Sequence, residues 1–216
     1  MRMYDLHTHT LHSDGELLPI ELVRRAAVLG YTTVGITDHV DASNISRVIE
    51  AAGAVREEAA GYGVRLLCGV EITHVPPAHI AGLARRARSE GAELVVVHGE
   101  TTVEPVAPGT NRAACTCADV DVLAHPGFIT PGDAREAAAR GVAIEITARG
   151  GHNRTNGHVL AVARETGCTL LVNSDTHGPG DLMSADARRV VAMGAGMSKE
   201  ECERVLSFDV MGWLKT

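Results

Sequence analysis

Short hydrophobic runs alternate along the chain with longer segments whose apolar residues recur at helical spacing. The runs are rich in β-branched residues, and one of them contains Val95, Val96 and Val97 in succession. Such continuous hydrophobicity favours parallel strands that are buried on both faces. The pattern predicts seven strands, at residues 3–9, 33–37, 65–72, 94–98, 120–125, 142–147 and 169–175.

The amphipathic segments between these runs predict helices. Pro19 and Pro131 stand at first helical positions, where a missing N–H costs nothing, and Gly30 and Gly141 follow the last turn before a strand. Residues 99–113 predict a long irregular loop, a kind of segment that is often functional. Helices are predicted at residues 19–29, 45–60, 77–89, 131–140 and 157–166, with further helices but no strand in residues 181–215.

This alternation is typical of βα units that build a parallel sheet or barrel. No linker, low-complexity tract or internal repeat interrupts it, so we expect a single domain over residues 1–216. The N-terminus has no long apolar run, and no stretch approaches the roughly 20 apolar residues of a membrane span. We therefore expect a cytoplasmic protein without a signal peptide or membrane contact.

Composition narrows the class of partner. The formal net charge of −7 and the 3% of aromatic residues disfavour stable binding to nucleic acid, which relies on basic surfaces and base stacking. A small anionic substrate stays compatible, because bound metal ions reverse the local charge. Cys68 and Cys168 lie in strand-like runs as small core residues, and Cys115 and Cys117 have no second cysteine pair that would support a zinc site.

Every predicted strand carries a potential metal ligand at or near its carboxyl end. His7 and His9 are separated by one residue, so both imidazoles would point the same way on a strand. The carboxyl ends of parallel strands converge on one face of a β/α fold, where active sites lie. The residues gathered there would be His7, His9, Asp38, His39, Glu71, His98, His125, Glu145, Asp175 and His177.

The strand-end histidines are six of the 11 in the chain. Burying so many imidazoles and carboxylates together without a metal ion would be costly. Neutral imidazoles mixed with carboxylates suit Zn²⁺, Mn²⁺ or Fe²⁺. The sequence therefore predicts a metal centre. The short motifs that contain these residues are Asp5-Leu6-His7-Thr8-His9, Ser13-Asp14-Gly15, Ile36-Thr37-Asp38-His39, Gly69-Val70-Glu71, His98, Ala124-His125-Pro126 and Asn173-Ser174-Asp175-Thr176-His177.

At these motifs, which span residues 5–177, the chain resembles the polymerase-and-histidinol-phosphatase (PHP) family. The resemblance implies a distorted TIM-like barrel of seven βα units, a trinuclear centre of divalent metal ions, of which we expect two to three to bind, and hydrolysis of phosphate esters. It also implies that Glu71 bridges two of the metals. The implied ligands are His7, His9, Asp175 and Glu71 for the first metal, Glu71, His98 and His125 for the second, and His39 and His177 for the third.

The third metal needs one more ligand from the loop after the His-x-His motif. Asp14 is our preferred residue and His12 is the alternative, because the sequence offers both in this loop. The expected activity is hydrolysis of a small-molecule phosphomonoester, in the manner of histidinol phosphatase, by attack of a metal-activated hydroxide on phosphorus. The alternatives are a nuclease or phosphodiesterase that acts on short oligonucleotides or nucleotide diesters, and a non-catalytic metal-binding module.

Three further acidic residues could support the ligands. Asp5 shares a strand face with His7 and could orient an imidazole. Asp38 could orient His39 in the same way or cap the turn that follows. Glu145 could orient a ligand, or it could be a buried carboxylate paired with an arginine.

The loop after the sixth strand offers candidates for substrate contact. Arg149 could clamp a phosphate through two parallel hydrogen bonds, or it could be a solvated surface residue. His152 could donate a proton to the leaving group. Residues 100–112 could shape the substrate pocket, with Asn111 and Arg112 as candidates. The histidines outside the strand-end pattern are expected to be structural or at the surface: His74, His79 and His158.

Overall fold

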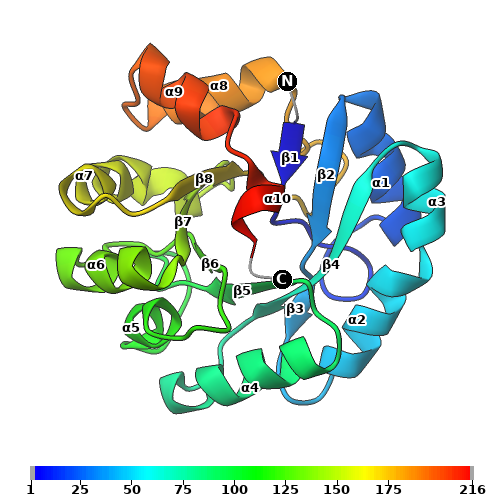
Figure 1. Cartoon of the computed structure of the whole chain (residues 1–216), viewed down its shortest axis with the longest axis horizontal. Helices are drawn as coiled ribbons and strands as arrows, with labels where there is room; N and C mark the ends of the chain where they lie inside the picture. Colours follow the sequence, from blue (N-terminus) through cyan, green and yellow to red (C-terminus); the bar gives the residue numbers. More distant parts are fainter. Residues whose placement is uncertain (1–2, 215–216) are drawn as a thin grey trace.

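The computed structural model describes residues 3–214, whose parallel strands form a nearly closed barrel ringed by helices (Figure 1). The strands pair in the order β1-β2-β4-β5-β6-β7-β8, and the short β3 pairs with β4. The expected barrel of seven βα units is confirmed. The strands are β1 (Met3–Asp5), β2 (Tyr31–Ile36), β3 (His39–Val40), β4 (Arg65–Ile72), β5 (Leu94–His98), β6 (Val122–Ala124), β7 (Ala143–Thr147) and β8 (Leu170–Asn173).

The barrel closes where its first and last strands meet. Thr8 and Thr176 form an isolated parallel bridge, and the His9 N–H donates to the Thr176 carbonyl at 2.8 Å. The first strand is shorter than predicted and ends at Asp5. Because the chain beyond it joins the segment after β8 through a single bridge rather than a ladder, His7 and His9 lie past the strand, at the seam of the barrel.

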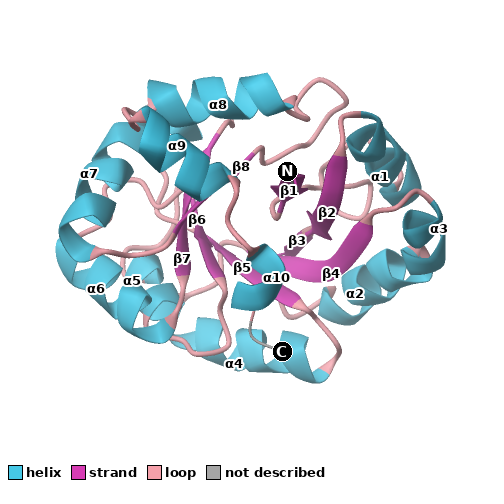
Figure 2. Ribbon diagram, turned by 45° about the horizontal axis from the view of Figure 1, so that its top comes forward, coloured by secondary structure: helices cyan, strands magenta, loops and turns pink. Residues whose placement is uncertain are grey.

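Helices connect the strands and cover the outside of the barrel, as Figure 2 shows. Gly141 ends one of them as expected, and Gly167 ends another, with left-handed φ values of 69° and 71°. The helices are α1 (Pro19–Val28), α2 (Ile45–Ala54), α3 (Arg56–Gly61), α4 (Pro77–Ser89), α5 (Thr110–Cys115), α6 (Pro131–Arg140), the 3₁₀ helix η1 (His152–Thr155), α7 (Asn156–Thr166), α8 (Ala185–Gly194), α9 (Lys199–Leu206) and α10 (Val210–Trp213).

Two predicted segments between the strands also differ from the structure. The helix predicted at residues 45–60 is divided at Val55 into α2 and α3. Arg56, the first residue of α3, pairs with Glu93 at 2.6 Å, so α3 is tied to the chain just before β5. The irregular segment predicted at residues 99–113 is also partly helical, because α5 begins at Thr110.

Apolar side chains fill the barrel, and the C-terminal helix packs on them. Tyr4, Leu6 and Leu94 belong to this interior cluster together with Val210 of α10. Figure 1 shows α10 across the middle of the barrel. Tyr4 in the middle of β1 and Thr33 in the first half of β2 line a cavity with α10. The helix therefore covers the amino-terminal end of the barrel and leaves the carboxyl end of the strands for the polar site.

The five cysteines are all buried free thiols. Cys115 and Cys117 pack in the layer between barrel and helices. Within residues 3–214 no cysteine joins a group of three or more potential metal ligands, and no helix is long and apolar enough to cross a bilayer.

Candidate metal centre

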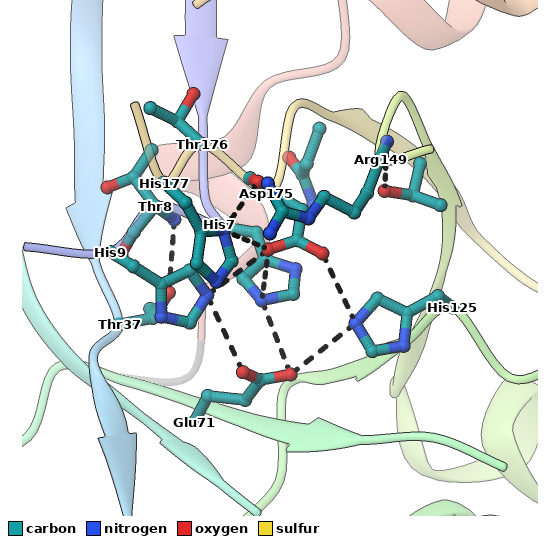
Figure 3. Close-up of polar contacts among 12 residues, drawn as sticks. His7, Thr8, His9, Thr37, Glu71, His125, Arg149, Asp175, Thr176 and His177 are labelled. Atoms are coloured by element: carbon teal, nitrogen blue, oxygen red, sulfur yellow. Dashed lines mark hydrogen bonds and ion pairs between the residues drawn. The ribbon is translucent and has the colours of Figure 1, made fainter. Parts of the chain in front are cut away.

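Two buried carboxylates lie among imidazoles at the carboxyl end of the barrel (Figure 3). Glu71 in β4 and Asp175 after β8 are 0% and 2% exposed. Glu71 Oε1 lies 3.3 Å from His7 Nε2 and 3.7 Å from His125 Nε2, and its Oε2 lies 3.6 Å from His9 Nε2. Asp175 lies 3.7, 3.5 and 3.3 Å from the same three nitrogens. The two carboxylates therefore share three histidines.

A second group lies nearer to solvent and is centred on Asp14. Its Oδ1 lies 3.2 Å from His177 Nε2, 3.5 Å from His39 Nε2 and 3.9 Å from His9 Nδ1. His12 belongs to none of the groups of three or more potential ligands found within residues 3–214. Of the two residues offered by this loop, the structure brings Asp14 to the other expected ligands of the third metal.

A third group occupies another edge of the site. Potential ligand atoms of His98, His125 and His152 lie within 4.8 Å of one another. Glu104, from the loop between β5 and α5, contacts this group. Its Oε2 lies 3.1 Å from His98 Nε2 and also 3.1 Å from His74 Nε2, and its Oε1 lies 3.3 Å from His152 Nε2.

Glu145, inside β7, contacts residues of the buried group and positions them. Its Oε1 lies 2.8 Å from His7 Nδ1 and accepts a hydrogen bond from Asn173 Nδ2 at 2.9 Å, while its Oε2 accepts the His125 N–H at 3.0 Å. A carboxylate on one ring nitrogen of a histidine fixes the tautomer and leaves the other nitrogen free to bind a metal. The alternative partner, an arginine, is not among these contacts.

Asp5 holds the backbone of the centre rather than an imidazole ring. Its carboxylate accepts the His7 N–H at 3.2 Å and the Ser174 N–H at 3.1 Å. Burial raises the pKa of Asp5 to about 6. Asp5 therefore links the two segments that carry His7 and Asp175 across the seam of the barrel.

Asp38 anchors the loop that carries Asp14. It accepts hydrogen bonds from the Thr10 N–H at 2.7 Å, from the Thr10 hydroxyl at 2.6 Å and from the Ser13 hydroxyl at 2.6 Å. These contacts differ from both roles expected for Asp38, which were to orient His39 or to cap the following turn. The residue instead fixes the position of an expected ligand that is itself 56% exposed at its side chain.

Three non-glycine residues of the site have positive φ values. They are 52° at His74, 21° at His125 and 56° at Asp175. Such conformations cost energy and persist only where the surrounding structure imposes them, which is common at functional sites. The strain is therefore concentrated at residues whose side chains point into the polar cluster.

Buried polar atoms of the centre lack hydrogen-bond partners in the described chain. They include His7 Nε2, both ring nitrogens of His9, Glu71 Oε1 and Asp175 Oδ1. Each unsatisfied buried group costs about 1–3 kcal/mol. Since these atoms face one another and are the nitrogen and oxygen donors that divalent ions bind, the residues present fit a metal centre.

Opposite charges shift the pKa values of this cluster. Burial lowers the pKa of His39, but Glu71 and Asp14 outweigh burial and raise it to about 10. Burial raises the pKa of Glu71, yet the charges of His7 and His39 hold it well below its usual value. Burial and the charge of a neighbouring imidazole lower the pKa of His125 to about 3. Glu71 is therefore an anionic donor near neutral pH.

Arg149 follows β7 and lines a cavity of about 510 Å³ together with Ser174 and Asp181. Its Nη1 lies 3.5 Å from Asp181 Oδ2, and 34% of its side chain is exposed. Asp181 in turn accepts the N–H groups of His177 and Gly178 at 3.0 and 2.7 Å. The guanidinium is thus held beside the segment that carries Asp175 (Figure 3), and the exposed part of the side chain is accessible to an anion.

The candidates for the pocket in residues 100–112 do not reach the site. Asn111 accepts the Glu100 N–H at 2.9 Å and donates to the Pro126 carbonyl at 2.8 Å, so it braces two loops. Arg112 pairs with Glu136 of α6 at 3.1 Å, on the outside of the barrel.

Three residues of the site are not predicted from the sequence. Glu104 and Asp181 lie outside the predicted set, and His74 is among the histidines expected to be structural or at the surface. All three lie in loops rather than at strand ends. The only sequence signal was the long segment at residues 99–113, which contains Glu104.

Residues 5–174 match the family model of the PHP domain. The chain therefore belongs to the PHP family, in agreement with its motifs, its barrel and the clustered histidines and carboxylates.

Two relatives and one solved structure match most of the chain. A Methanocaldococcus jannaschii protein named "Uncharacterized protein MJ1295" is 48% identical over 205 residues, which cover 94% of each chain. Ribonuclease P protein component 3 of Methanosarcina mazei is 28% identical over 219 residues, covering 94% of this chain and 85% of the relative. Histidinol phosphate phosphatase (HisK) from Lactococcus lactis, complexed with zinc, L-histidinol and phosphate, shares the fold with a TM-score of 0.63 and 15% identity, covering 91% of this chain and 95% of HisK.

Proposed function

We propose that this chain is a single PHP-type domain that acts as a metal-dependent phosphoesterase on a small-molecule phosphomonoester. The observation that carries the proposal is the pair of buried carboxylates, Glu71 and Asp175, which share His7, His9 and His125. Anionic oxygens shared between groups of imidazoles are suited to hold adjacent divalent ions.

Two to three zinc, manganese or iron ions would be held by the residues that the resemblance implied. Bound ions of this kind polarise a phosphate ester and lower the pKa of water. Glu71 would be the shared ligand of the first two. The proposed ligands are His7, His9, Asp14, His39, Glu71, His98, His125, Asp175 and His177.

Other residues of the chain would bind substrate and handle protons. Arg149 would bind the phosphate oxygens through its partly exposed guanidinium. His152 would hold a proton for the leaving oxygen, with its Nε2 positioned 3.3 Å from Glu104. Glu145 would keep the proton of His7 on Nδ1, so that Nε2 presents its lone pair to the centre.

The charge of the chain favours a small substrate over a polynucleotide. The formal net charge is −7, and Glu104 and Asp181 add negative charge beside His152 and Arg149. HisK, which shares the fold, is complexed with L-histidinol and phosphate. Stable binding of nucleic acid would instead require a basic surface.

A second candidate is a nuclease or phosphodiesterase that acts on short oligonucleotides or nucleotide diesters. The observation that favours it is the similarity to ribonuclease P protein component 3 over 94% of this chain. A non-catalytic metal-binding module is the third candidate. The proposed ligands lie together at the carboxyl end of the barrel, which argues against this candidate.

A hydrolysis assay separates these candidates. The full chain, loaded with Mn²⁺ or Zn²⁺, would be tested with p-nitrophenyl phosphate, bis-p-nitrophenyl phosphate and a short oligoribonucleotide. We expect turnover of the monoester, and loss of more than about 100-fold in Asp175→Asn, since even a residue behind a ligand affects activity by about 10–100-fold. Glu57→Gln on the exposed face of α3 is the control.

Each other result selects another candidate. Turnover of the diester or the oligoribonucleotide alone favours the nuclease. Metal binding without any turnover favours the non-catalytic module. Fewer than about two bound ions per chain by elemental analysis would contradict the metal centre itself.

A further inference from the structure

Glu104 lies outside the ligand set that the PHP resemblance implies, yet it contacts three imidazoles. One oxygen, Oε2, lies 3.1 Å from both His74 Nε2 and His98 Nε2, and Oε1 lies 3.3 Å from His152 Nε2. Ligand atoms of His74, His98 and Glu104 lie within 4.8 Å of one another. The set combines imidazoles with a carboxylate, a combination that divalent transition metals bind.

The other ring nitrogen of His98 determines where its proton lies. Nδ1 is 3.2 Å from the Gly99 carbonyl oxygen, which can only accept a hydrogen bond, so Nδ1 carries the proton. In the neutral ring, Nε2 then presents a lone pair to the Glu104 carboxylate. Two groups that can only accept repel each other at this distance, so the contact needs either a second proton, on Nε2, or a metal cation between the two atoms.

The same arrangement occurs at a proposed metal ligand elsewhere in the centre. His177 Nδ1 lies 3.0 Å from the Asp175 carbonyl oxygen, and its Nε2 lies 3.2 Å from Asp14 Oδ1. His177 and Asp14 are proposed ligands of the third metal. His98 and Glu104 repeat this pairing of a bare Nε2 with a carboxylate, at another edge of the site.

The loop that carries Glu104 is fixed at two residues that precede it. Before it, Glu100 Oε1 accepts the Asn111 N–H at 2.8 Å. Beside it, Val103 packs so closely on Gly151 that a Cβ built at Gly151 would lie 3.3 Å from Val103 Cγ1. Glu104 is therefore held at the site by its own loop and by the loop that carries His152.

We propose that Glu104 and His74 are further ligands of the divalent ion that His98 binds. This role depends on the metal centre of the proposed function. The added carboxylate brings negative charge to an ion otherwise held by imidazoles and the shared Glu71, and the ion fixes the β5–α5 loop over the site. Metal binding and the order of residues 99–109 are then coupled.

Metal affinity of two variants tests the added ligands. Glu104→Gln keeps the shape of the side chain and removes its anionic oxygen, and His74→Asn removes the second ligand. Titration with a chromophoric chelator should show one ion bound at least about tenfold more weakly in each variant, with the other ions unchanged. Glu57→Gln, which alters the net charge equally from the exposed face of α3, should bind all ions as the wild type does.

Amide hydrogen exchange gives a second readout. Adding Mn²⁺ or Zn²⁺ should protect residues 99–109 in the wild type and in Glu57→Gln, but less in Glu104→Gln. If both variants bind every ion with the affinity of the wild type, Glu104 only pairs with protonated imidazoles and the added ligands are refuted. A wild type that binds fewer than about two ions refutes the proposed function as well, so the two failures are distinguishable.

Discussion

At the scale of single residues, the candidate centre depends on side chains that contact the proposed ligands and fix their orientation. Glu145 is fully buried and contacts His7, the amide of Asn173 and the backbone of His125. It therefore determines the orientation of one imidazole and the position of another. The ionised form is favoured there, because the charge of His7 outweighs burial and lowers the pKa of Glu145.

Glu145→Gln should weaken metal binding while leaving the fold intact. A glutamine oxygen can still accept one hydrogen bond, but the fixed charge that raises the basicity of His7 is lost. We expect a loss of about 10–100-fold in the affinity of the first metal, measured by chelator competition. Unchanged affinity would show that His7 is oriented by other contacts.

The choice between Asp14 and His12 can be decided by counting ions. Asp14 Oδ1 lies 3.2 Å from His177 Nε2. Asp14→Asn should therefore lose one ion per chain by elemental analysis, whereas His12→Asn should retain the wild-type number. Loss of an ion only in His12→Asn would reverse the assignment.

Residues at strand ends could be predicted because strand spacing determines where they gather. The βα alternation places Glu71, His98 and Asp175 at one end of the barrel, whatever the loops do. Glu104 and His74 could not be predicted in the same way, because their positions depend on loop conformation, including the positive φ of 52° at His74.

At the scale of elements, the site depends on close contact between β2, β4 and β5. Gly69 in β4 is two residues before Glu71. A Cβ built at Gly69 would lie 2.8 Å from Thr37 Cγ2, 2.9 Å from the Leu94 carbonyl oxygen and 3.1 Å from the Ile36 carbonyl oxygen. Two of these atoms belong to the backbone, so relief would require neighbouring strands to move apart.

Gly69→Ala should lower the free energy of unfolding by about 1–3 kcal/mol, the usual cost of overpacking. The matched control is Gly82→Ala in α4, where a built Cβ meets nothing within 4 Å. That change should stabilise the chain by about 0.5–1 kcal/mol through helix propensity. Urea denaturation measures both, and equal effects of the two substitutions would contradict the close packing of β4.

Elements were predicted best where the sequence marks their ends. The helices predicted at residues 77–89 and 131–140 agree with α4 and α6. The predicted helix at residues 45–60 contains Gly53, which a helix interior tolerates at a modest cost, yet it divides at Val55, where the Arg56 side chain turns to Glu93. This long-range ion pair cannot be read from local periodicity.

At the scale of the whole molecule, the polar centre links metal binding to stability. Ions that bind only the folded chain would stabilise it by about 2.7 kcal/mol per site at 100 times the dissociation constant. In the metal-free protein, obtained by adding a chelator, protons on imidazoles balance the buried carboxylates. The pKa of His39 is raised to about 10, because Glu71 and Asp14 outweigh burial, and the pKa of His7 is raised well above its usual value.

The stabilising effect of metal should therefore increase with pH. Histidines whose pKa is raised by folding stabilise the metal-free protein, fully so below a pH of about 6.5, the pKa of histidine in the unfolded chain. This contribution is lost as the pH rises toward the pKa of about 10 that His39 has in the folded protein. Metal binding must displace the same protons, so affinity improves over the same range. The difference in Tm between the Mn²⁺-loaded protein and the metal-free protein should be larger at pH 8 than at pH 6. An equal or smaller difference at pH 8 would show that the ions do not replace protons on His7 and His39.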